Sequence, residues 1–468
     1  MAAGHRPDRG RLPVHRRPPR ALLLRRLSAG EPAAMSASPV EPPAGGSARA
    51  ERPALPPLLL QRDFAALWWG QLISILGDRL TYLALGGLLL EHTNRGADPR
   101  YAVLLALLGN VMVAPVLLFA PFTGAWVDRW NLQRVLVVSD VLRAGIVLAI
   151  PWLYALTGHT GTTFALVFAL FTANVFFLPA KSAITPEIVH PAQLLAANSL
   201  LSVAGIAATA VGALAGGWVV DHWGWKTALE IDAATYLVSV VSLAAVRYRP
   251  GPHRPGRPAV SGSGYLAEVR EGWSLIRRNA AVGLALIALG AVWLGGGFLH
   301  VAGNQHVQRA ASIPGMERVG LLLFALGIGS ALSTWWVNTH GRRAPRPVVL
   351  GAGFVLAGLS LVAFAVTTRF AVFAASGFLV GAFIAPAFVL TETLLQQGTE
   401  PRQRGRVFSA RDFLMRLAFL VSVSVAGWIT GALGTRATLL VCAALLAMVG
   451  AWSIAFGRRH PELMRPPA

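Results

Sequence analysis

The chain is organised by long apolar segments that follow one another from Phe64 almost to its end. Each has about 20 residues, enough for a helix to cross a bilayer core of about 30 Å. Backbone groups that face lipid must be satisfied within the protein, so these segments are predicted to be helices. We predict an all-α integral membrane protein with about twelve transmembrane helices. The expected spans are 64–90, 101–123, 135–156, 162–184, 196–220, 227–247, 280–303, 318–338, 347–367, 370–395, 407–432 and 436–457.

Short motifs recur at one fixed spacing, which indicates two related halves. The stretch GAWVDRWNLQR (124–134) has a weaker counterpart in TWWVNTHGRR (334–343), and GGWVVDHWG has one in AGWITGALG. Matched positions are the same distance apart in both cases (336 − 126 = 210; 427 − 217 = 210). The pairs are Trp126 with Trp336, Gly217 with Gly427, Trp218 with Trp428, and Gly224 with Gly434. This repeat predicts two pseudo-symmetric six-helix bundles around a central cavity, related by an axis along the membrane normal.

Composition and charge support the membrane assignment and predict an orientation. Only 13% of the 468 residues are charged, whereas soluble proteins carry about 25%. Arginines gather in the two tails and in alternate loops, which the positive-inside rule assigns to the cytoplasm. The net charge of +20 is thereby explained without nucleic-acid binding. We expect a multi-pass protein of the plasma membrane with both termini in the cytoplasm.

The same patterns divide the chain into parts. The first 61 residues are rich in Pro, Arg, Ala and Ser and show no apolar periodicity, so we expect a disordered basic tail. The expected parts are the tail 1–61, an N-terminal six-helix bundle 62–247, a cytoplasmic linker 248–279, a C-terminal six-helix bundle 280–457, and a cytoplasmic tail 458–468.

The charged turn at 124–134 resembles the loop between spans 2 and 3 of major facilitator superfamily transporters. Gly124, Asp128, Arg129 and Arg134 stand where that pattern has them, and Asn131 replaces its usual glycine in what we expect to be a left-handed turn. The resemblance implies a conformational latch, an ion-pair network that holds in one state and breaks in another. The alternative is a plain solvated turn. The further latch residues we expect are Asp140 and, across the halves, Arg411 and Asp412.

Two other stretches carry the same resemblance. GALAGG (212–217) is similar to the antiporter motif of exporters in the superfamily, with Ala213 where proline is usual. RDFAALWWGQLISILGDRL (62–80) and SDVLRAG (139–145) resemble the first and third spans of its drug- and siderophore-exporter branch. The small residues also predict close helix packing, against span 8 at Gly327 and Gly329, or a sliding gate between the halves. The packing residues we expect are Gly205, Gly212, Gly216 and Gly217.

Charged residues inside predicted spans are costly unless they are paired or face a cavity. Asp78 and Arg79 lie about 15 residues into span 1, roughly 20 Å of helix. Asp78 could exchange a proton with substrate, or it could form a static pair with Arg79 or Arg143. Both interpretations remain open at this point. The proton-coupling candidates are Asp78, Arg79, Arg143 and Glu392.

Other polar residues in the spans receive simpler assignments. Glu230 and Asp232 are expected at the outer start of span 6, where negative charge suits a helix N-terminus. Substrate is expected to meet inward-facing polar and aromatic side chains near the midplane. The cavity candidates are Gln71, Asn110, Asn174, Trp293, His300 and Asn304.

Sequence motifs also limit the function class. The chain has no Gly-Lys-Ser phosphate loop, and no group of His, Cys or carboxylate residues has the spacing of metal ligands. We therefore expect a protein that binds no cofactor and no metal and is not an enzyme. We predict a monomeric secondary transporter that exports a small amphipathic molecule, such as a drug, macrolide-like compound or siderophore, against inward proton flow. The alternatives are a proton-coupled importer, or a non-transporting receptor or acyl-transfer enzyme, which the isolated His159 and His190 disfavour.

Overall fold

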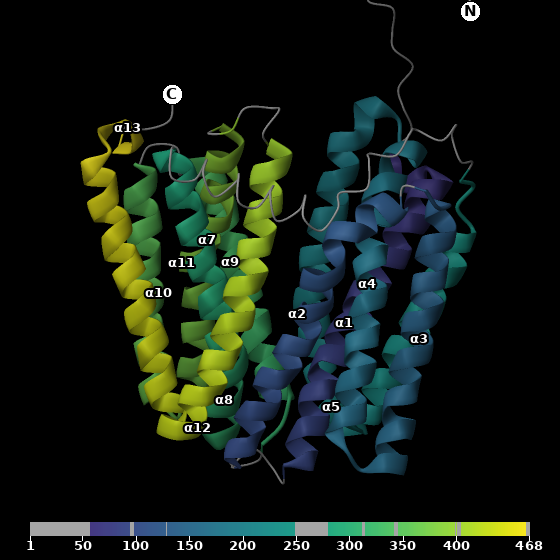
Figure 1. The fold of residues 1–468 in the computed structure, drawn as a ribbon, viewed down its shortest axis with the longest axis horizontal. Coiled ribbons are helices and arrows are strands. Elements are labelled where there is room, and N and C mark those ends of the chain that lie inside the picture. The colour runs from purple at the N-terminus through teal and green to yellow at the C-terminus, as the bar shows by residue number, and fades with distance from the viewer. Residues whose placement is uncertain are drawn as a thin grey trace, which may run out of the picture. The chain divides into compact units, whose positions relative to one another are not determined.

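The computed structural model describes residues 57–93, 98–127, 129–248, 279–310, 314–340, 345–397, Thr399 and 404–464, and their regular structure is entirely helical. Ten helices in these ranges are long and apolar enough to cross a membrane (Figure 1). The elements of the N-terminal half are η1 (Leu58–Leu60), α1 (Arg62–His92), α2 (Pro99–Val127), α3 (Leu132–Thr157), α4 (Thr160–Ile188), η2 (Pro191–Gln193) and α5 (Leu194–Ala244). Those of the C-terminal half are α7 (Ala280–Phe298), η3 (Leu299–Gly303), α8 (Asn304–Ala310), α9 (Glu317–His340), α10 (Arg346–Val366), α11 (Phe370–Gln397), α12 (Arg404–Arg459) and α13 (Pro461–Met464).

Two of these helices, α5 and α12, are too long for one crossing. With 51 and 56 residues, each would extend for more than about 75 Å if it were straight, against a core of about 30 Å. Both are broken by a glycine in the left-handed region, Gly224 (φ 88°) and Gly434 (φ 84°), at which two helices meet. These glycines are one of the pairs in the sequence repeat. Counting each kinked helix as two spans turns the ten described helices into the expected twelve.

Most of the predicted N-terminal tail and of the linker lies outside the described residues, namely 1–56 and 249–278. Of the predicted C-terminal tail only residues 465–468 lie outside, because α12 continues to Arg459 and α13 follows. The expected tail boundary at residue 61 differs from the structure, because η1 precedes α1. Leu58 is buried there against Phe64, Val189 and Ala197. The folded part therefore begins no later than Pro57, since these apolar side chains cover the first turn of α1.

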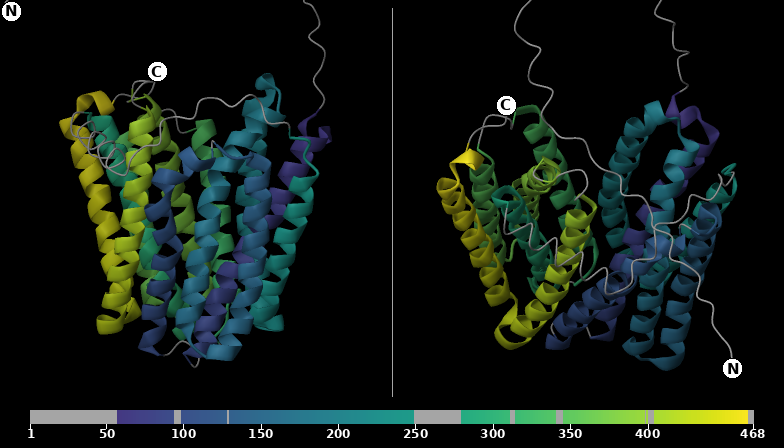
Figure 2. Two further views of the ribbon diagram at one scale, coloured as in Figure 1. Left: turned by 45° about the vertical axis from the view of Figure 1, so that its right-hand side comes forward. Right: turned by 45° about the horizontal axis from the view of Figure 1, so that its top comes forward.

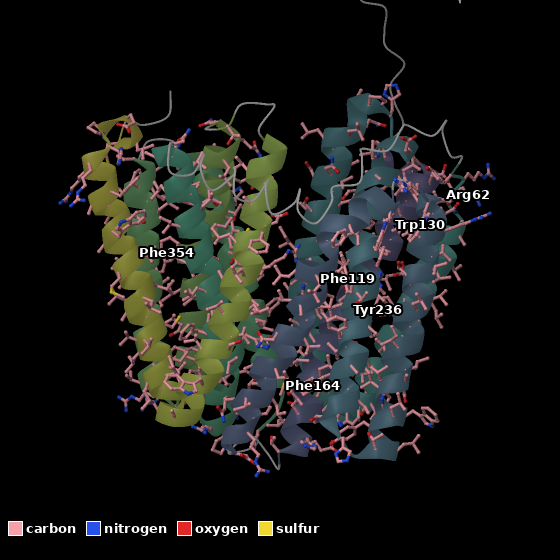
Figure 3. All side chains as sticks on the ribbon, viewed as in Figure 1. Arg62, Phe119, Trp130, Phe164, Tyr236 and Phe354 are labelled. Atoms are coloured by element: carbon pink, nitrogen blue, oxygen red, sulfur yellow. The ribbon has the colours of Figure 1, made fainter. Side chains whose placement is uncertain are left out.

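Each half is held together by close helix pairs. In the N-terminal half α1 packs along α5, and α3 packs on α4 and α5; in the C-terminal half α10 packs along α12, and α9 packs along α11. Figures 1 and 2 show these helices running side by side. Tyr236 and Phe354, labelled in Figure 3, are among the largest fully buried side chains of the two halves.

The glycines of GALAGG pack in two directions. A Cβ on Gly212 or Gly216 would lie 2.8–3.1 Å from the backbone of α1, at Leu76 or Leu80. A Cβ on Gly217 would lie 2.5 Å from the carbonyl oxygen of Met316, which precedes α9 in the other half. Missing side chains thus let α5 approach both neighbours at backbone distance.

The expected partners on span 8 were only partly correct. Gly327 on α9 does lie near Ala210 of α5, at 3.3 Å. Gly329 faces the backbone of Phe378 on α11 instead, so it serves packing within the C-terminal half. Gly205 has only Ile75 nearby, at 3.8 Å, and makes no close approach.

Hydrogen bonds join the two halves at the end that the predicted orientation places outside. Asp221, close to the α5 kink, accepts the backbone N–H groups of Met316 (2.6 Å) and Glu317 (2.8 Å) and so caps α9. Further bonds join the first half of α2 to the C-terminal half. These are Tyr101 to Asn304 (3.0 Å), Gln305 to the Asp98 carbonyl (3.2 Å) and Asn110 to Ser424 (2.9 Å). The described contacts therefore close this end of the molecule.

Candidate substrate and proton site

The site is built around one polar turn in the middle of α1. Asp78, Arg79, Thr81 and Tyr82 lie within five consecutive positions of a helix that is otherwise mostly apolar. Because neighbouring positions on a helix differ by about 100°, these side chains point to different neighbours. Asp78 and Thr81 face partners on the N-terminal half, whereas Tyr82 reaches the C-terminal half.

Asp78 forms a pair with Arg143, one of the two static pairs that the sequence allowed. The Asp78 Oδ1 lies 3.9 Å from the Arg143 guanidinium and accepts a 2.5 Å hydrogen bond from the Tyr236 hydroxyl. The side chain of Asp78 is 37% exposed, whereas that of Arg143 is 3% exposed. The Asp78 carboxylate is therefore much more accessible from the cavity than the Arg143 guanidinium.

Arg143 is fixed by more than Asp78. Its guanidinium carbon lies 4.2 Å from the Phe177 ring centre and 4.6 Å from that of Tyr236, both within range of a cation–π attraction. Its other nitrogen pairs with Asp140. Loss of the Asp78 charge would thus leave Arg143 with one carboxylate partner and two rings.

Asp140, which was expected to take part in the cytoplasmic latch, lies in this buried cluster. α3 begins at Leu132, so Asp140 lies about 12 Å along the helix. Its side chain is fully buried and pairs with Arg143 one turn later. The sequence did place both residues on one helix face, and that part of the prediction is confirmed.

Asp232 is the member that the sequence analysis misjudged. It was assigned to the outer start of span 6, but it lies eight positions beyond the kink at Gly224, about 12 Å into the helix. Its fully buried carboxyl group accepts hydrogen bonds from the hydroxyls of Thr81 and Thr235. Counting from the repeated glycine would have revealed this depth.

Two cavities meet at α1. The first, about 170 Å³, is enclosed by the N-terminal half and is lined by Asp78, Arg79, Thr81, Tyr82, Met112, Arg143, Leu170, Phe171, Asn174 and Tyr236. The second, about 290 Å³, is lined largely by aliphatic and aromatic residues of α7 and α9–α12. Arg79 and Tyr82 line both cavities, so they separate a polar compartment from an apolar one.

Arg79 is not committed to a partner as Arg143 is. In the described part of the chain its guanidinium forms no ion pair, and its buried Nε has no hydrogen-bond partner. An unpaired buried donor on a cationic group carries a desolvation cost of about 1–3 kcal/mol or more. A ligand group with acceptor oxygens would relieve that cost.

A histidine on a π-helical turn completes the boundary between the cavities. η3 interrupts the helix after α7, and π turns are frequent at functional sites. His300 Nε2 lies 3.1 Å from the Leu105 carbonyl oxygen, and its Nδ1 lies 2.6 Å from the Tyr82 hydroxyl. Since a carbonyl can only accept, Nε2 donates, and in that tautomer Nδ1 accepts a hydrogen bond from the Tyr82 hydroxyl.

The expected cavity residues divide into two groups. Asn174 lines the polar cavity, and His300 and Asn304 line the apolar one. Three others do not line either cavity: Gln71 is buried on α1, Asn110 joins the halves at Ser424, and Trp293 packs on Phe419 with ring centres 6.0 Å apart. Hydropathy cannot distinguish a cavity-facing amide from one that joins two helices.

The family model described as Major Facilitator Superfamily matches residues 67–344 and 315–468 of the chain. The chain belongs to the Major Facilitator Superfamily. The superfamily and the relatives below consist of transporters, so this member is a multi-pass membrane transporter and not an enzyme. Such a protein takes a small-molecule substrate through the bilayer.

Individual relatives support the same conclusion. An uncharacterised transporter of Mycobacterium tuberculosis is 28% identical over 382 residues, which cover 78% of this chain and 84% of the relative. Macrolide efflux protein A of Streptococcus pyogenes is 24% identical over 404 residues, covering 82% and 94%. A bacterial homologue of the human lysosomal transporter Spinster, solved inward-facing and occupied, has a TM-score of 0.65 at 12% identity, covering 87% and 99%.

The superfamily loop after α2 is only partly described, because Asp128 lies outside the described residues. Asn131 is not left-handed as expected: its φ is −68°, and its side chain caps α3 by accepting the Arg134 N–H at 3.0 Å. Arg129 and Arg134 are exposed beside it.

The expected partner region across the halves is engaged within its own half. Arg411 pairs with Glu392 and with Asp412 (2.9 Å). Glu392 is 43% exposed at the predicted inner end and lines neither cavity, which weakens its case as a proton carrier. A latch between this region and the loop stays a prediction.

Proposed function

We propose that this transporter exports small amphipathic molecules in exchange for protons, with Asp78 as the proton-carrying group. The observation that carries the proposal is the Asp78–Arg143–Tyr236 arrangement. It combines a reachable carboxylate at mid-membrane depth with a buried cation that cannot leave. Such intramembrane carboxylates are typical of proton relays in transporters.

This geometry supports the proposed exchange. With Asp78 ionised, its charge is balanced by Arg143 across 3.9 Å. A proton that arrives from outside neutralises the carboxyl group and releases that attraction. Arg143 keeps Asp140, so its own position costs little to maintain. Release of the proton inside restores the pair and resets the binding site, which couples proton entry to substrate exit.

The cavities support the substrate class. The apolar cavity suits a hydrophobic body, and Arg79, Tyr82 and His300 offer polar contacts at its edge. This combination favours an amphipathic molecule with acceptor oxygens. Export is supported by the antiporter-like GALAGG stretch and by the likeness to macrolide efflux protein A. We further propose a monomer with both termini in the cytoplasm of a bacterial plasma membrane, and a cytoplasmic latch at 124–134.

Transport in inside-out membrane vesicles tests this proposal. The wild type should accumulate a labelled macrolide or another amphipathic drug when the vesicle interior is acidified, and a protonophore should abolish the accumulation. Asp78→Asn should bind drug without accumulating it. Glu230→Gln, which removes an exposed acid on α5, is the matched control and should transport normally.

Two outcomes would overturn the assignment. Accumulation by Asp78→Asn with unchanged pH dependence removes Asp78 from the coupling step. Accumulation only in right-side-out vesicles with an acidic exterior makes the protein an importer, the alternative left open by its sequence.

A further inference from the structure

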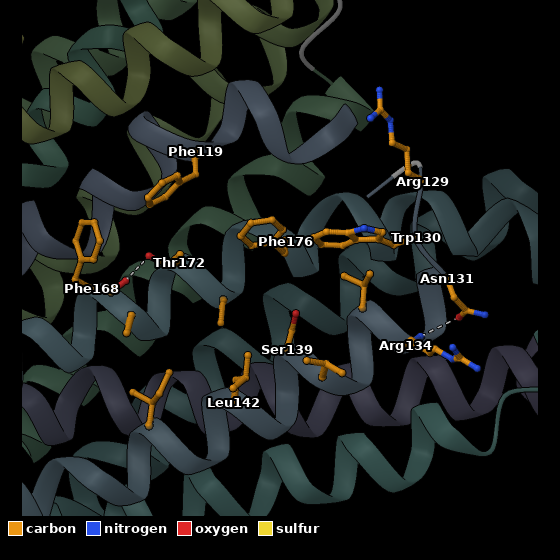
Figure 4. Close-up of a pocket in the computed structure, with 15 residues that line it drawn as sticks. Phe119, Arg129, Trp130, Asn131, Arg134, Ser139, Leu142, Phe168, Thr172 and Phe176 are labelled. Carbon is orange, nitrogen blue, oxygen red and sulfur yellow. Dashed lines mark hydrogen bonds between the residues drawn. The ribbon is translucent and has the colours of Figure 1, made fainter. Parts of the chain in front are cut away.

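A second large recess lies away from the substrate cavities, on the N-terminal half. α2 and α3 both pack on α4 but hardly touch each other, which leaves a groove between them with α4 as its floor. The groove has a volume of about 900 Å³ and is shown in Figure 4. Its lining belongs to α2, α3, α4 and the turn between α2 and α3, and none of it is on α1, so the groove is separate from the cavities there.

The interior of the groove is apolar and edged by aromatic rings. Phe119 and Phe168 meet edge to face at one end, with ring centres 6.4 Å apart. At the other end Trp130 stacks on Phe176 at 6.1 Å. Val138 and Leu142 line the wall and are each more than half exposed. In a bilayer these surfaces are covered by hydrocarbon.

The mouth of the groove is basic. Arg129 and Arg134 line it from the turn between α2 and α3 and from the start of α3. Both are exposed, and neither forms an ion pair in the described part of the chain. Trp130 lies between them in sequence, and Figure 4 shows its ring beside Phe176 at this end. A tryptophan with adjacent cations is typical of the headgroup level of a membrane.

The length of the groove matches one leaflet. Its lining on α3 runs from Arg134 to Ile146, about 18 Å of helix. Half of a hydrocarbon core of about 30 Å is about 15 Å. With the arginines at headgroup level, the apolar part therefore spans the inner leaflet to about its midplane.

We propose that this groove binds one anionic phospholipid of the inner leaflet. The phosphate lies between Arg129 and Arg134, and an acyl chain lies over α4 between the Phe176 and Phe119 ends. Apolar length, aromatic edges and two uncommitted cations all fit this occupant. A zwitterionic lipid would fit the same groove, but its headgroup would be attracted less strongly by the two arginines at the mouth.

Native mass spectrometry of the purified protein tests the headgroup contact. Phosphatidylglycerol should bind at least about tenfold more tightly than phosphatidylcholine with the same acyl chains. Arg129→Gln/Arg134→Gln should weaken phosphatidylglycerol binding about 30-fold, or about 2 kcal/mol, since each cation at the surface contributes about 1 kcal/mol. Arg458→Gln/Arg459→Gln removes two exposed cations from the end of α12 and should leave binding unchanged.

Photo-crosslinking tests the groove itself. A phosphatidylglycerol with a photoreactive acyl chain should label the α4 peptide that contains Phe168 and Thr172. Ala169→Trp fills the groove from its floor and should abolish the label. Ala165→Trp changes an exposed residue one turn away, outside the lining, and should not.

Three results would overturn the proposal. Equal binding of the two lipids, or no effect of the double arginine variant, removes the specific headgroup site. Unchanged labelling in Ala169→Trp means that the lipid lies elsewhere. Displacement of the label by a transported drug, with the drug itself crosslinked to α4, makes the groove an entry route for substrate.

Discussion

Two arginines next to Asp78 differ in their surroundings, and this difference defines their roles. Arg143 is enclosed by two carboxylates and two rings, whereas Arg79 faces both cavities without an ion pair in the described residues. We assign the first to the proton site and the second to substrate recognition. The sequence could show that both arginines are charges within predicted spans, but it could not show which of them forms the ion pair with Asp78.

The assignment of Arg79 predicts a selective loss of affinity. Arg79→Gln removes a charged donor from the cavity, and hydrogen bonds to charged groups are worth about 1.5–3 kcal/mol. Substrates with an acidic or strongly accepting group should bind about 10- to 150-fold more weakly, while their neutral esters should bind nearly as before. Calorimetric titration of acid–ester pairs measures this. Equal losses for acid and ester would mean that Arg79 only shapes the cavity.

The buried Asp232 predicts a stability effect at Thr81. Thr81→Val deletes the hydroxyl that donates to Asp232 Oδ2 and leaves a buried acceptor unpaired. We expect a loss of about 1–3 kcal/mol in the free energy of unfolding, measured as a lower Tm in detergent. Glu230→Gln, two positions from Asp232 on α5, should melt like the wild type. A normal Tm for Thr81→Val would show that another group satisfies Asp232.

At the scale of elements, the sequence predicted most of the helices, and the errors arose at their ends. Apolar length identifies a span, but capping decides where it begins, as Asn131 does for α3. The kink at Gly224 places Asp232 deeper in its helix than the outer start at which it was expected. This error arose because hydropathy averages over about 20 residues, whereas a kink is a single residue.

The close approach of α5 to α9 predicts a conformational change on overpacking. Gly217→Val would place a side chain against the Met316 carbonyl, only 2.5 Å from the new Cβ. Overpacking costs about 1–3 kcal/mol, so the closed outer end should lose population by about 5- to 150-fold.

Pulsed electron–electron double resonance between spin labels on the ends of α5 and α9 that meet at this contact measures the change as a longer distance. Gly431→Val on α12, where a Cβ meets nothing within 4 Å, is the control and should leave the distance unchanged. A distance in Gly217→Val equal to that of the wild type would show that this contact does not hold the outer side closed.

At the scale of the whole transporter, the 210-residue sequence repeat predicted two related helix bundles. The two bundles differ in the charged residues they carry. Gly224 and Gly434 break equivalent helices, as the sequence offset indicated. The charged cluster, in contrast, has no counterpart at the equivalent positions. At the 210-residue offset, Asp78, Arg79, Asp140, Arg143 and Asp232 correspond to the uncharged residues Ala288, Leu289, Leu350, Gly353 and Cys442. No second cluster of acids lines the described cavities. The first half therefore holds the charged cluster that we propose carries the proton, and the second supplies most of the apolar cavity surface.

Proton release on drug binding tests the central claim most directly. Purified protein in weak buffer with a pH indicator dye should release protons when drug is added, because substrate and proton compete at Asp78. Asp78→Asn should bind the drug and release none, and Glu230→Gln should behave like the wild type. Equal proton release by Asp78→Asn and the wild type would contradict the account, since another group would then carry the proton.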